Sequence, residues 1–228
     1  MKHVIGFSGG IDSQAALRWL LNRYPKEDII ALNTQAGRNE HALTVEHVAW
    51  YSENVHPIIE VVPLIRDMWE TEGHAETKGL NGDDELTFEG LIEIKGRSPS
   101  ARAQFCTENL KLRPIRRWIR ENLGDSDYEM YTGVRRDESD GRKDTAFKEW
   151  SEFFDTYVNN VIADWKKEMC FHYVELHGEQ YNPLYKLGFN RVGCAPCIHD
   201  KKHGILLWHQ RFPERIDRVC AGSNSARA

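Results

Sequence analysis

The chain has 228 residues with a formal net charge of −5, and 40% of the residues are hydrophobic. This length and composition suit one α/β domain with a small second module, and the acidic balance excludes a surface that is basic overall, leaving only local patches for nucleic acid. No apolar run approaches a membrane span and no signal-peptide segment opens the chain, so we expect a cytoplasmic protein with no membrane partner. Five cysteines, two of them in a C-x-x-C pair, favour metal or redox chemistry over a disulfide framework in such a chain.

A glycine turn between a predicted strand and a predicted helix comes first. The apolar run at residues 4–7 predicts a buried strand, and leucines at helical spacing from Leu17 predict a helix. The N–H groups and dipole of a helix N-terminus attract an anion, and glycines let the backbone approach it closely. Asp12 is expected to cap the helix or to hold Mg²⁺ or a donor. The predicted phosphate-binding residues are Ser8, Gly9, Gly10, Asp12 and Ser13.

This turn, Ser8-Gly9-Gly10-Ile11-Asp12-Ser13, resembles the SGGxDS loop of the adenine nucleotide alpha hydrolase (PP-loop) superfamily, which includes N-type ATP pyrophosphatases and phosphoadenosine phosphosulfate (PAPS) reductases. The resemblance implies a doubly wound parallel α/β sheet in the order 3-2-1-4-5. It also implies a nucleotide-binding domain in residues 1–178, with a small cysteine-containing module in residues 179–228 packed on it. An ordinary turn before a capped helix is the alternative.

A second buried strand is predicted at residues 29–32, and it ends at Asn33-Thr34-Gln35. Ligands of open α/β sheets bind beyond the carboxyl ends of strands, so these polar residues are placed to meet a nucleotide. The family resemblance implies that Thr34 and Gln35 lie near the adenosine, although Asn33 stands where the family often has Asp. A plain strand-to-helix turn is the alternative. A helix at residues 40–53 and a third strand at residues 57–63 are predicted next.

A basic stretch follows, in which Phe105-Cys106-Thr107 precedes Lys111 and a helix that opens at Pro114. The arginines of this helix are more typical of a solvent-exposed face than of a surface that binds nucleic-acid phosphates. The F-C-T-x-x-L-K-x-x-P string is similar to one in PAPS reductase-type proteins, and this implies that Lys111 lies near the anionic substrate.

A fourth strand is predicted at residues 128–132, and a G-x-R-x-x-E-S-x-x-R string similar to one in the family follows it. Arginines present forked donors to phosphate or sulfate, and a carboxylate can orient one fork. A surface ion-pair cluster is the alternative. The residues expected to contact the nucleotide are Gly133, Arg135, Glu138 and Arg142.

Residues 145–178 are rich in aromatic side chains, and we predict that they form helices whose aromatics are core rather than a base-stacking platform. Cys170 is expected to be a small buried hydrophobe.

The C-terminal module is predicted to begin near Asn182-Pro183-Leu184-Tyr185 and to contain Cys194 and Cys197 at ligand spacing for zinc or an iron–sulfur cluster. Further ligands must come from Cys106, Cys220 or a histidine, and a thiol–disulfide pair or two structural thiols are the alternatives. The N-P-L-Y…R-x-G-C-x-x-C string is similar to one in mobile-element PAPS reductase-like proteins and DNA phosphorothioation sulfurtransferases, and some relatives bind a [4Fe–4S] cluster. The predicted metal ligands are Cys106, Cys194, Cys197 and Cys220.

These motifs favour an enzyme that binds ATP or PAPS. In the preferred scheme ATP with Mg²⁺ adenylates an acceptor, sulfur then displaces AMP, and a cluster on the cysteines carries the sulfur. The catalytic residues are then Asp12, Lys111 and Arg135. Thiol-dependent reduction of PAPS or adenosine phosphosulfate is the second scheme, and a non-catalytic nucleotide-binding module is the third. The E-C-G-[IL]-H string of the reductases is absent, because Cys220 lies in Val219-Cys220-Ala221.

The partners implied are an adenine nucleotide and a sulfur donor or thiol reductant. DNA, tRNA or a small molecule is the acceptor, and relatives often form homodimers.

Overall fold

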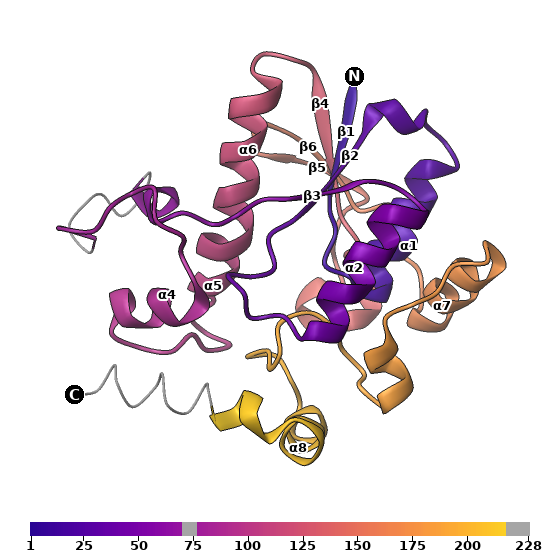
Figure 1. Cartoon of the computed structure of the whole chain (residues 1–228). Helices are drawn as coiled ribbons and strands as arrows, with labels where there is room; N and C mark the ends of the chain where they lie inside the picture. The colour runs from indigo at the N-terminus through magenta and orange to yellow at the C-terminus, as the bar shows by residue number, and fades with distance from the viewer. Residues whose placement is uncertain (70–76, 218–228) are drawn as a thin grey trace. The chain divides into compact units, whose positions relative to one another are not determined.

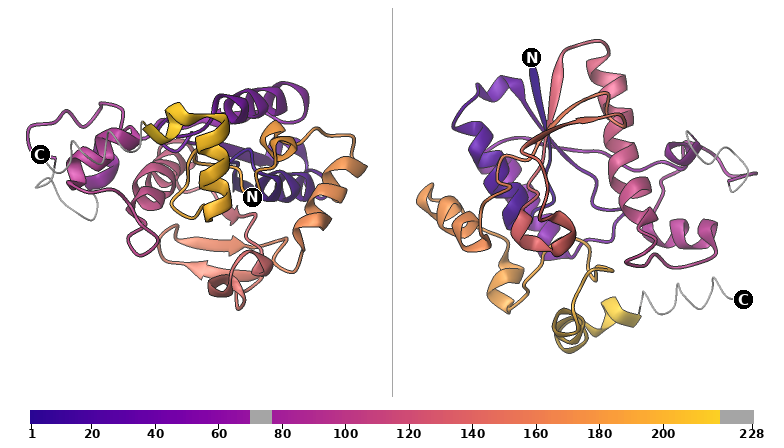
Figure 2. Two further views of the ribbon diagram at one scale, coloured as in Figure 1. Left: turned by 90° about the horizontal axis from the view of Figure 1, so that it is seen from below. Right: turned by 180° about the vertical axis from the view of Figure 1, so that it is seen from behind.

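The computed structural model describes residues 1–69 and 77–217 of the chain. They form two compact units (Figures 1 and 2). The first, here called the sheet unit, comprises Met1–Asn33, Ala42–Ile59 and Leu123–Leu187. The second, here called the cysteine unit, comprises Thr34–His41, Glu60–Asn122 and the residues from Gly188 onward. The division at residue 178 stays a prediction.

The sheet has six strands in the order β3-β2-β1-β4-β6-β5. Strands β1, β2, β4 and β6 are parallel where they pair, and β5 runs antiparallel to β6 at the edge. The strands are β1 (Lys2–Gly6), β2 (Ile29–Asn33), β3 (Ile58–Glu60), β4 (Tyr128–Tyr131), β5 (Lys148–Ser151) and β6 (Thr156–Asn159). The expected α/β sheet and its order 3-2-1-4 are therefore confirmed, whereas the strand beside β4 is β6 and the antiparallel edge strand β5 was not predicted. In the central strand β1, Val4 and Ile5 are fully covered because the strand is buried on both faces.

The prediction of helices throughout residues 145–178 is wrong for its first half. Residues 148–159 form the β5–β6 hairpin, seen as two antiparallel arrows in the left view of Figure 2. Trp150 lies directly opposite Tyr157, and both residues are nearly half exposed, while Phe147 is slightly more than half exposed. Successive side chains of this segment alternate between the two faces of the sheet, as in any strand. The prediction was wrong because the spacing of the aromatic residues also fits the period of a helix. Cys170 is fully buried as predicted.

Helices α1 (Ile11–Leu21), α2 (Ala42–Asn54) and α7 (Lys167–Leu176) belong to the sheet unit. α1 follows β1 directly, and its buried face includes Leu17 and Leu20. α7 contributes Cys170 and Val174 to the same core, so α1 and α7 pack together. This packing fixes the start of α1, where the phosphate site is predicted.

The cysteine unit has a core of its own, made by side chains such as Met68, Leu91 and Leu110. Its helices are α4 (Phe88–Lys95), α5 (Phe105–Thr107), α6 (Arg113–Leu123) and α8 (Lys202–Arg211). The arginine face of α6 is only partly solvated, because Arg117 pairs with the buried Asp67 at 2.7 Å. Among the described residues, no helix is both long and apolar enough to span a bilayer.

Candidate functional site

The loop at residues 8–13 is closed by its own serines. The Ser13 hydroxyl donates to the Gly10 carbonyl at 2.9 Å and accepts from the Ser8 backbone N–H at 3.2 Å. The Ser8 hydroxyl lies 3.2 Å from the same oxygen. Gly10 is the N-cap of α1, so the loop leads the backbone straight into the positive end of the helix dipole.

Gly9 occupies a left-handed conformation with φ +70°, and a Cβ there would lie 3.0 Å from methyl groups of Thr44 and Val48 on α2. Both the dihedral angle and the space therefore require glycine at this point of the loop.

Asp12 pairs with Arg135 rather than capping α1, which corrects one of its expected roles. Arg135 Nε donates to Asp12 Oδ1 at 2.8 Å, and Nη2 lies 3.4 Å from Oδ2. The guanidinium also contacts Asp137 at 3.2 Å and is almost completely buried. Glu138 pairs with Arg142, as expected of a carboxylate that orients one guanidinium fork. The structure thus brings Asp12 and Arg135 together, with Glu138 and Arg142 as a second ion pair.

Gly133 follows β4 and passes very close to the loop. A Cβ at Gly133 would lie 2.6 Å from the backbone carbon and oxygen of Asp12 and 2.8 Å from the nitrogen of Ser13. Only glycine fits here because the neighbouring atoms are backbone and cannot rotate away. Gly133 thus has a steric role at the loop, and its predicted nucleotide contact stays a prediction.

Two residues of the N-P-L-Y string contact the loop at residues 8–13, although this string was predicted to belong to the cysteine-containing module. Asn182 is fully buried, and its amide donates to the Gly9 carbonyl at 3.2 Å and to the Thr44 hydroxyl at 3.1 Å. The Tyr185 hydroxyl accepts from the Ile11 backbone N–H at 2.9 Å. Burial raises the pKa of Tyr185, so the phenol stays protonated.

Cys170 is a third residue that sequence reasoning did not connect to the loop. Its thiol is buried against the Asp12 carboxylate, and burial first and the Asp12 charge second raise its pKa to about 12. Cys170 is therefore an unreactive thiol at neutral pH.

A buried polar network fastens the first turn of α1 to the segment before Asn182. Gln14 donates to Glu179 at 3.1 Å and to the Gln180 carbonyl at 2.8 Å, while Arg18 pairs with the same Glu179. The Tyr51 hydroxyl donates to Glu179 at 3.3 Å. These bonds keep the loop in one geometry because each buried polar group needs its partner.

In the cysteine unit, Thr34 and Gln35 begin an unusual turn. Residues Gln35, Ala36, Gly37 and Arg38 all have positive φ, between 45° and 63°. Non-glycine residues rarely adopt this conformation, and clusters of such residues occur at ligand sites. The adenosine contact of Thr34 and Gln35 stays a prediction.

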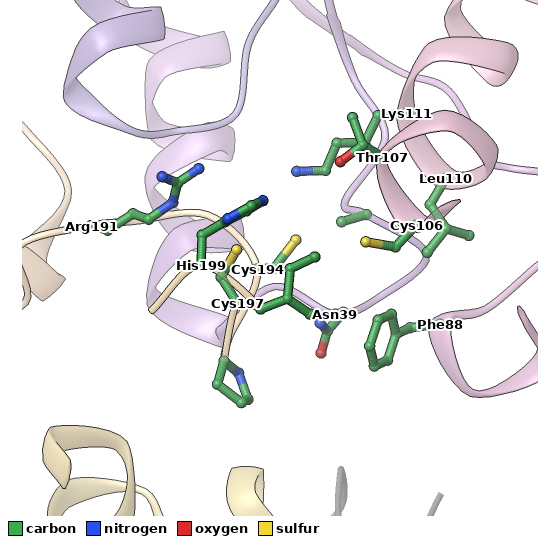
Figure 3. A pocket seen from close by; sticks show the side chains of 13 residues that line it. Asn39, Phe88, Cys106, Thr107, Leu110, Lys111, Arg191, Cys194, Cys197 and His199 are labelled. Atoms are coloured by element: carbon green, nitrogen blue, oxygen red, sulfur yellow. The ribbon is translucent and has the colours of Figure 1, made fainter. Parts of the chain in front are cut away.

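Three thiols line one cavity of about 60 Å³ in the cysteine unit. Figure 3 shows Cys106, Cys194 and Cys197 around this cavity. The Lys111 side chain, from the helical turn directly before α6, also lines it. The backbone of the C-x-x-C turn is held on one side by an Ala195 N–H bond to the Asn39 carbonyl at 2.7 Å. Asp200 holds the other side, accepting from Cys197 N and from Trp208 Nε1 at 3.0 Å each.

The electrostatics of this pocket favour a thiolate at Cys194. Donation from the Cys197 thiol, together with the charges of Lys111 and Arg191, holds the pKa of Cys194 well below its usual range. The negative Cys194 in turn raises the pKa of Lys111, and burial raises the pKa of Cys106. Lys111 therefore lies beside the Cys194 sulfur, and its predicted place near the anionic substrate stays a prediction.

The donor chemistry suits a thiolate-bound iron–sulfur cluster or zinc ion. The buried Asn39 lines the same cavity, and its Nδ2 has no hydrogen-bond partner within the described residues. This N–H group can therefore donate to an acceptor bound in the cavity. Within residues 1–69 and 77–217, however, no three His, Cys, Asp or Glu side chains are grouped closely enough to hold a metal ion. Cys220 lies outside the described residues.

A mostly parallel α/β sheet with a serine- and glycine-rich loop between β1 and α1 is the architecture of the PP-loop superfamily of adenine nucleotide alpha hydrolases. The model of the phosphoadenosine phosphosulfate reductase domain matches residues 2–200. The chain belongs to this reductase family.

Individual relatives agree with this assignment. The chain is 30% identical, over 251 aligned residues, to an uncharacterized 37.8 kDa protein of Escherichia phage 186, covering 95% of this chain and 73% of the relative. It is 36% identical over 200 residues to an adenosine 5′-phosphosulfate reductase of Mycolicibacterium smegmatis, covering 81% of this chain and 77% of that enzyme. The fold resembles a PAPS reductase from Candida auris solved as a phosphate complex, with a TM-score of 0.56 at 16% identity, covering 85% and 81% of the two chains.

Proposed function

We propose that the protein binds an adenine nucleotide at the loop Ser8–Ser13 and uses ATP with Mg²⁺ to activate an acceptor for sulfur transfer. The observation that carries the nucleotide part is the closed loop at the start of α1, with the partly exposed Asp12 paired to the buried Arg135 beside it. A closed loop with fixed N–H donors and a nearby guanidinium is prepared for phosphate before the ligand arrives.

In the first step, an acceptor oxygen attacks the α-phosphorus of ATP, the bond to the bridging oxygen breaks, and pyrophosphate leaves with the electron pair. The loop amides and the Ser8 hydroxyl stabilise charge on the phosphates, and Arg135 and Arg142 add cationic donors. In the second step, a sulfur nucleophile attacks the activated centre and AMP leaves. Cys194, which Lys111 and Cys197 stabilise as a thiolate, is the proposed sulfur-handling residue.

Thiol-dependent reduction of adenosine phosphosulfate or PAPS is the second candidate, and the Cys194–Cys197 pair favours it. The Cys194 thiolate would attack the sulfate sulfur and displace the nucleotide, leaving an S-sulfonate. Cys197 would then attack the cysteine sulfur, releasing sulfite and forming a disulfide, so the two thiols supply the two electrons. The similarity to adenosine phosphosulfate reductases supports this scheme, while the absent E-C-G-[IL]-H string weighs against it.

Nucleotide binding is tested by titrating ATP, PAPS and adenosine phosphosulfate into the wild type and the variants Arg135→Gln and Asp12→Asn. We expect both variants to weaken binding about tenfold or more, because each removes a charged partner at the phosphate loop. Arg136→Gln is the matched control, since Arg136 is the next residue and pairs with the surface Asp164. Equal affinity in Arg135→Gln and Arg136→Gln would remove Arg135 from the site.

The reaction is then assigned by two assays on the wild type. Exchange of labelled pyrophosphate into ATP in the presence of acceptor supports the activation scheme. Sulfite release from adenosine phosphosulfate or PAPS with a thiol, without exchange, supports reduction. Binding with neither reaction supports a non-catalytic nucleotide-binding module.

The cysteine pocket is proposed to hold a [4Fe–4S] cluster, with zinc as the alternative, on Cys106, Cys194 and Cys197. We expect anaerobically purified protein to contain iron and matching acid-labile sulfide, and Cys106→Ala and Cys194→Ala to lose both. Cys170→Ala is the control because that thiol is buried in the sheet unit. Zinc without sulfide would indicate a structural site, and protein free of both metals would leave the thiol pair as the reactive group.

A further inference from the structure

The first residue of α7 is a lysine that points inward. Lys167 is partly buried, whereas its neighbours Lys166 and Glu168 are exposed. Its ammonium lies 5.2 Å from the centre of the Tyr185 ring and 5.8 Å from the centre of the Phe171 ring. Aromatic faces attract a cation and offset part of the cost of removing it from water.

These contacts connect Lys167 to the phosphate loop. The hydroxyl of Tyr185, one of the rings beneath the lysine, accepts the backbone N–H of Ile11 in the first turn of α1. Buried Cys170, one turn further along α7, lies against the Asp12 carboxylate. The start of α7 is therefore fastened to the start of α1 at two points.

Three of the charges that act on Lys167 belong to the predicted phosphate site, and the fourth is its neighbour Glu168. Burial is the main influence and lowers the pKa of Lys167, and the guanidinium of Arg135 lowers it further. The carboxylates of Asp12, Glu168 and Glu138 act in the opposite direction. The Asp12 carboxylate already accepts from Arg135 through both of its oxygens. Lys167 is thus a second cation near Asp12. Its ammonium carries three donors on a flexible stem, so it can bind an anionic ligand at the predicted phosphate site.

We propose that Lys167 is a further substrate-binding residue, whose ammonium contacts the phosphate groups of the adenine nucleotide held by the loop Ser8–Ser13. This inference rests on the proposed function, since it assumes that the loop binds a nucleotide. Lys167 then adds a cation from α7 to a phosphate site whose proposed arginines, Arg135 and Arg142, come from the segment after β4. The two rings hold the lysine stem in place before the nucleotide arrives.

The test compares Lys167→Met, which keeps an apolar stem against the rings and removes the charge, with Lys167→Arg, which keeps the charge. Lys166→Met is the matched control, because it removes an exposed lysine one position earlier. Titration of each protein uses three probes, namely ATP, inorganic pyrophosphate and adenosine. We expect Lys167→Met to weaken ATP and pyrophosphate binding about tenfold, with adenosine affinity unchanged. Lys167→Arg should retain most of the affinity, and Lys166→Met should behave as the wild type.

Two outcomes overturn the inference alone. One is a Lys167→Met protein that binds ATP and pyrophosphate as the wild type does. The other is a Lys167→Met protein that loses adenosine affinity as much as ATP affinity, which indicates that the lysine only supports the fold. A wild-type protein that binds none of the nucleotides overturns the proposed function as well, so the two failures are distinguishable.

Discussion

Replacing Gly133 with alanine is expected to weaken ATP binding about 100-fold, which corresponds to the loss of one or two charged hydrogen bonds. The added methyl would lie 2.6 Å from backbone atoms of Asp12, so the end of β4 and the start of α1 must separate. Because the loop amides and Asp12 are fixed in place by the same backbone, that displacement spoils the phosphate site as a whole. Calorimetric titration of ATP measures the loss, and overpacking should also lower the free energy of unfolding by about 1–3 kcal/mol.

Gly141→Ala is the matched control, since a Cβ at Gly141 has no heavy atom within 4 Å among the described residues, and it lies in the same segment after β4. It should bind ATP as the wild type does. A Gly133→Ala protein that is folded and binds ATP normally would contradict the close packing of Gly133 on the loop.

Removing the ammonium of Lys111 is expected to slow alkylation of Cys194 at neutral pH about tenfold or more in metal-free protein. Thiolate, not thiol, reacts with iodoacetamide. Cys197 donation and the Lys111 charge both favour the Cys194 thiolate, so the pKa of Cys194 lies below its usual range. Loss of a nearby cation moves that pKa upward, because the cation favours the charged thiolate. In Lys111→Met the alkylation rate should therefore reach half its maximum at a higher pH.

The measurement is the rate of Cys194 labelling against pH, followed by mass spectrometry of the labelled peptide. Cys197→Ala should move the profile in the same direction, because it removes the donated hydrogen bond. Lys202→Met is the control, as Lys202 is exposed at the start of α8. Identical profiles for Lys111→Met and Lys202→Met would show that Lys111 does not stabilise the thiolate.

The parallel strands and the glycine loop were predictable because their signals are local. The apolar runs at residues 4–7 and 29–32 and the predicted strand at residues 128–132 each become a strand of the sheet, and the Ser8–Ser13 string marks a strand-to-helix turn without reference to distant residues. The β5–β6 hairpin was not predictable in the same way. Its aromatic residues fit a helical spacing about as well as a strand alternation, and only pairing with β4 decided between the two.

The sequence by itself determined the strands β1, β2 and β4, the loop chemistry and the presence of a thiol pair, because periodicity and motif spacing are properties of neighbouring residues. Only the tertiary structure decided that Asp12 pairs with Arg135, that Asn182 and Tyr185 hold the loop, and that Cys106 shares a cavity with Cys194 and Cys197. These partners lie many residues apart along the chain. Side chains so distant in sequence meet only after helices and strands pack, and that packing follows from the burial of the whole apolar surface rather than from any one segment.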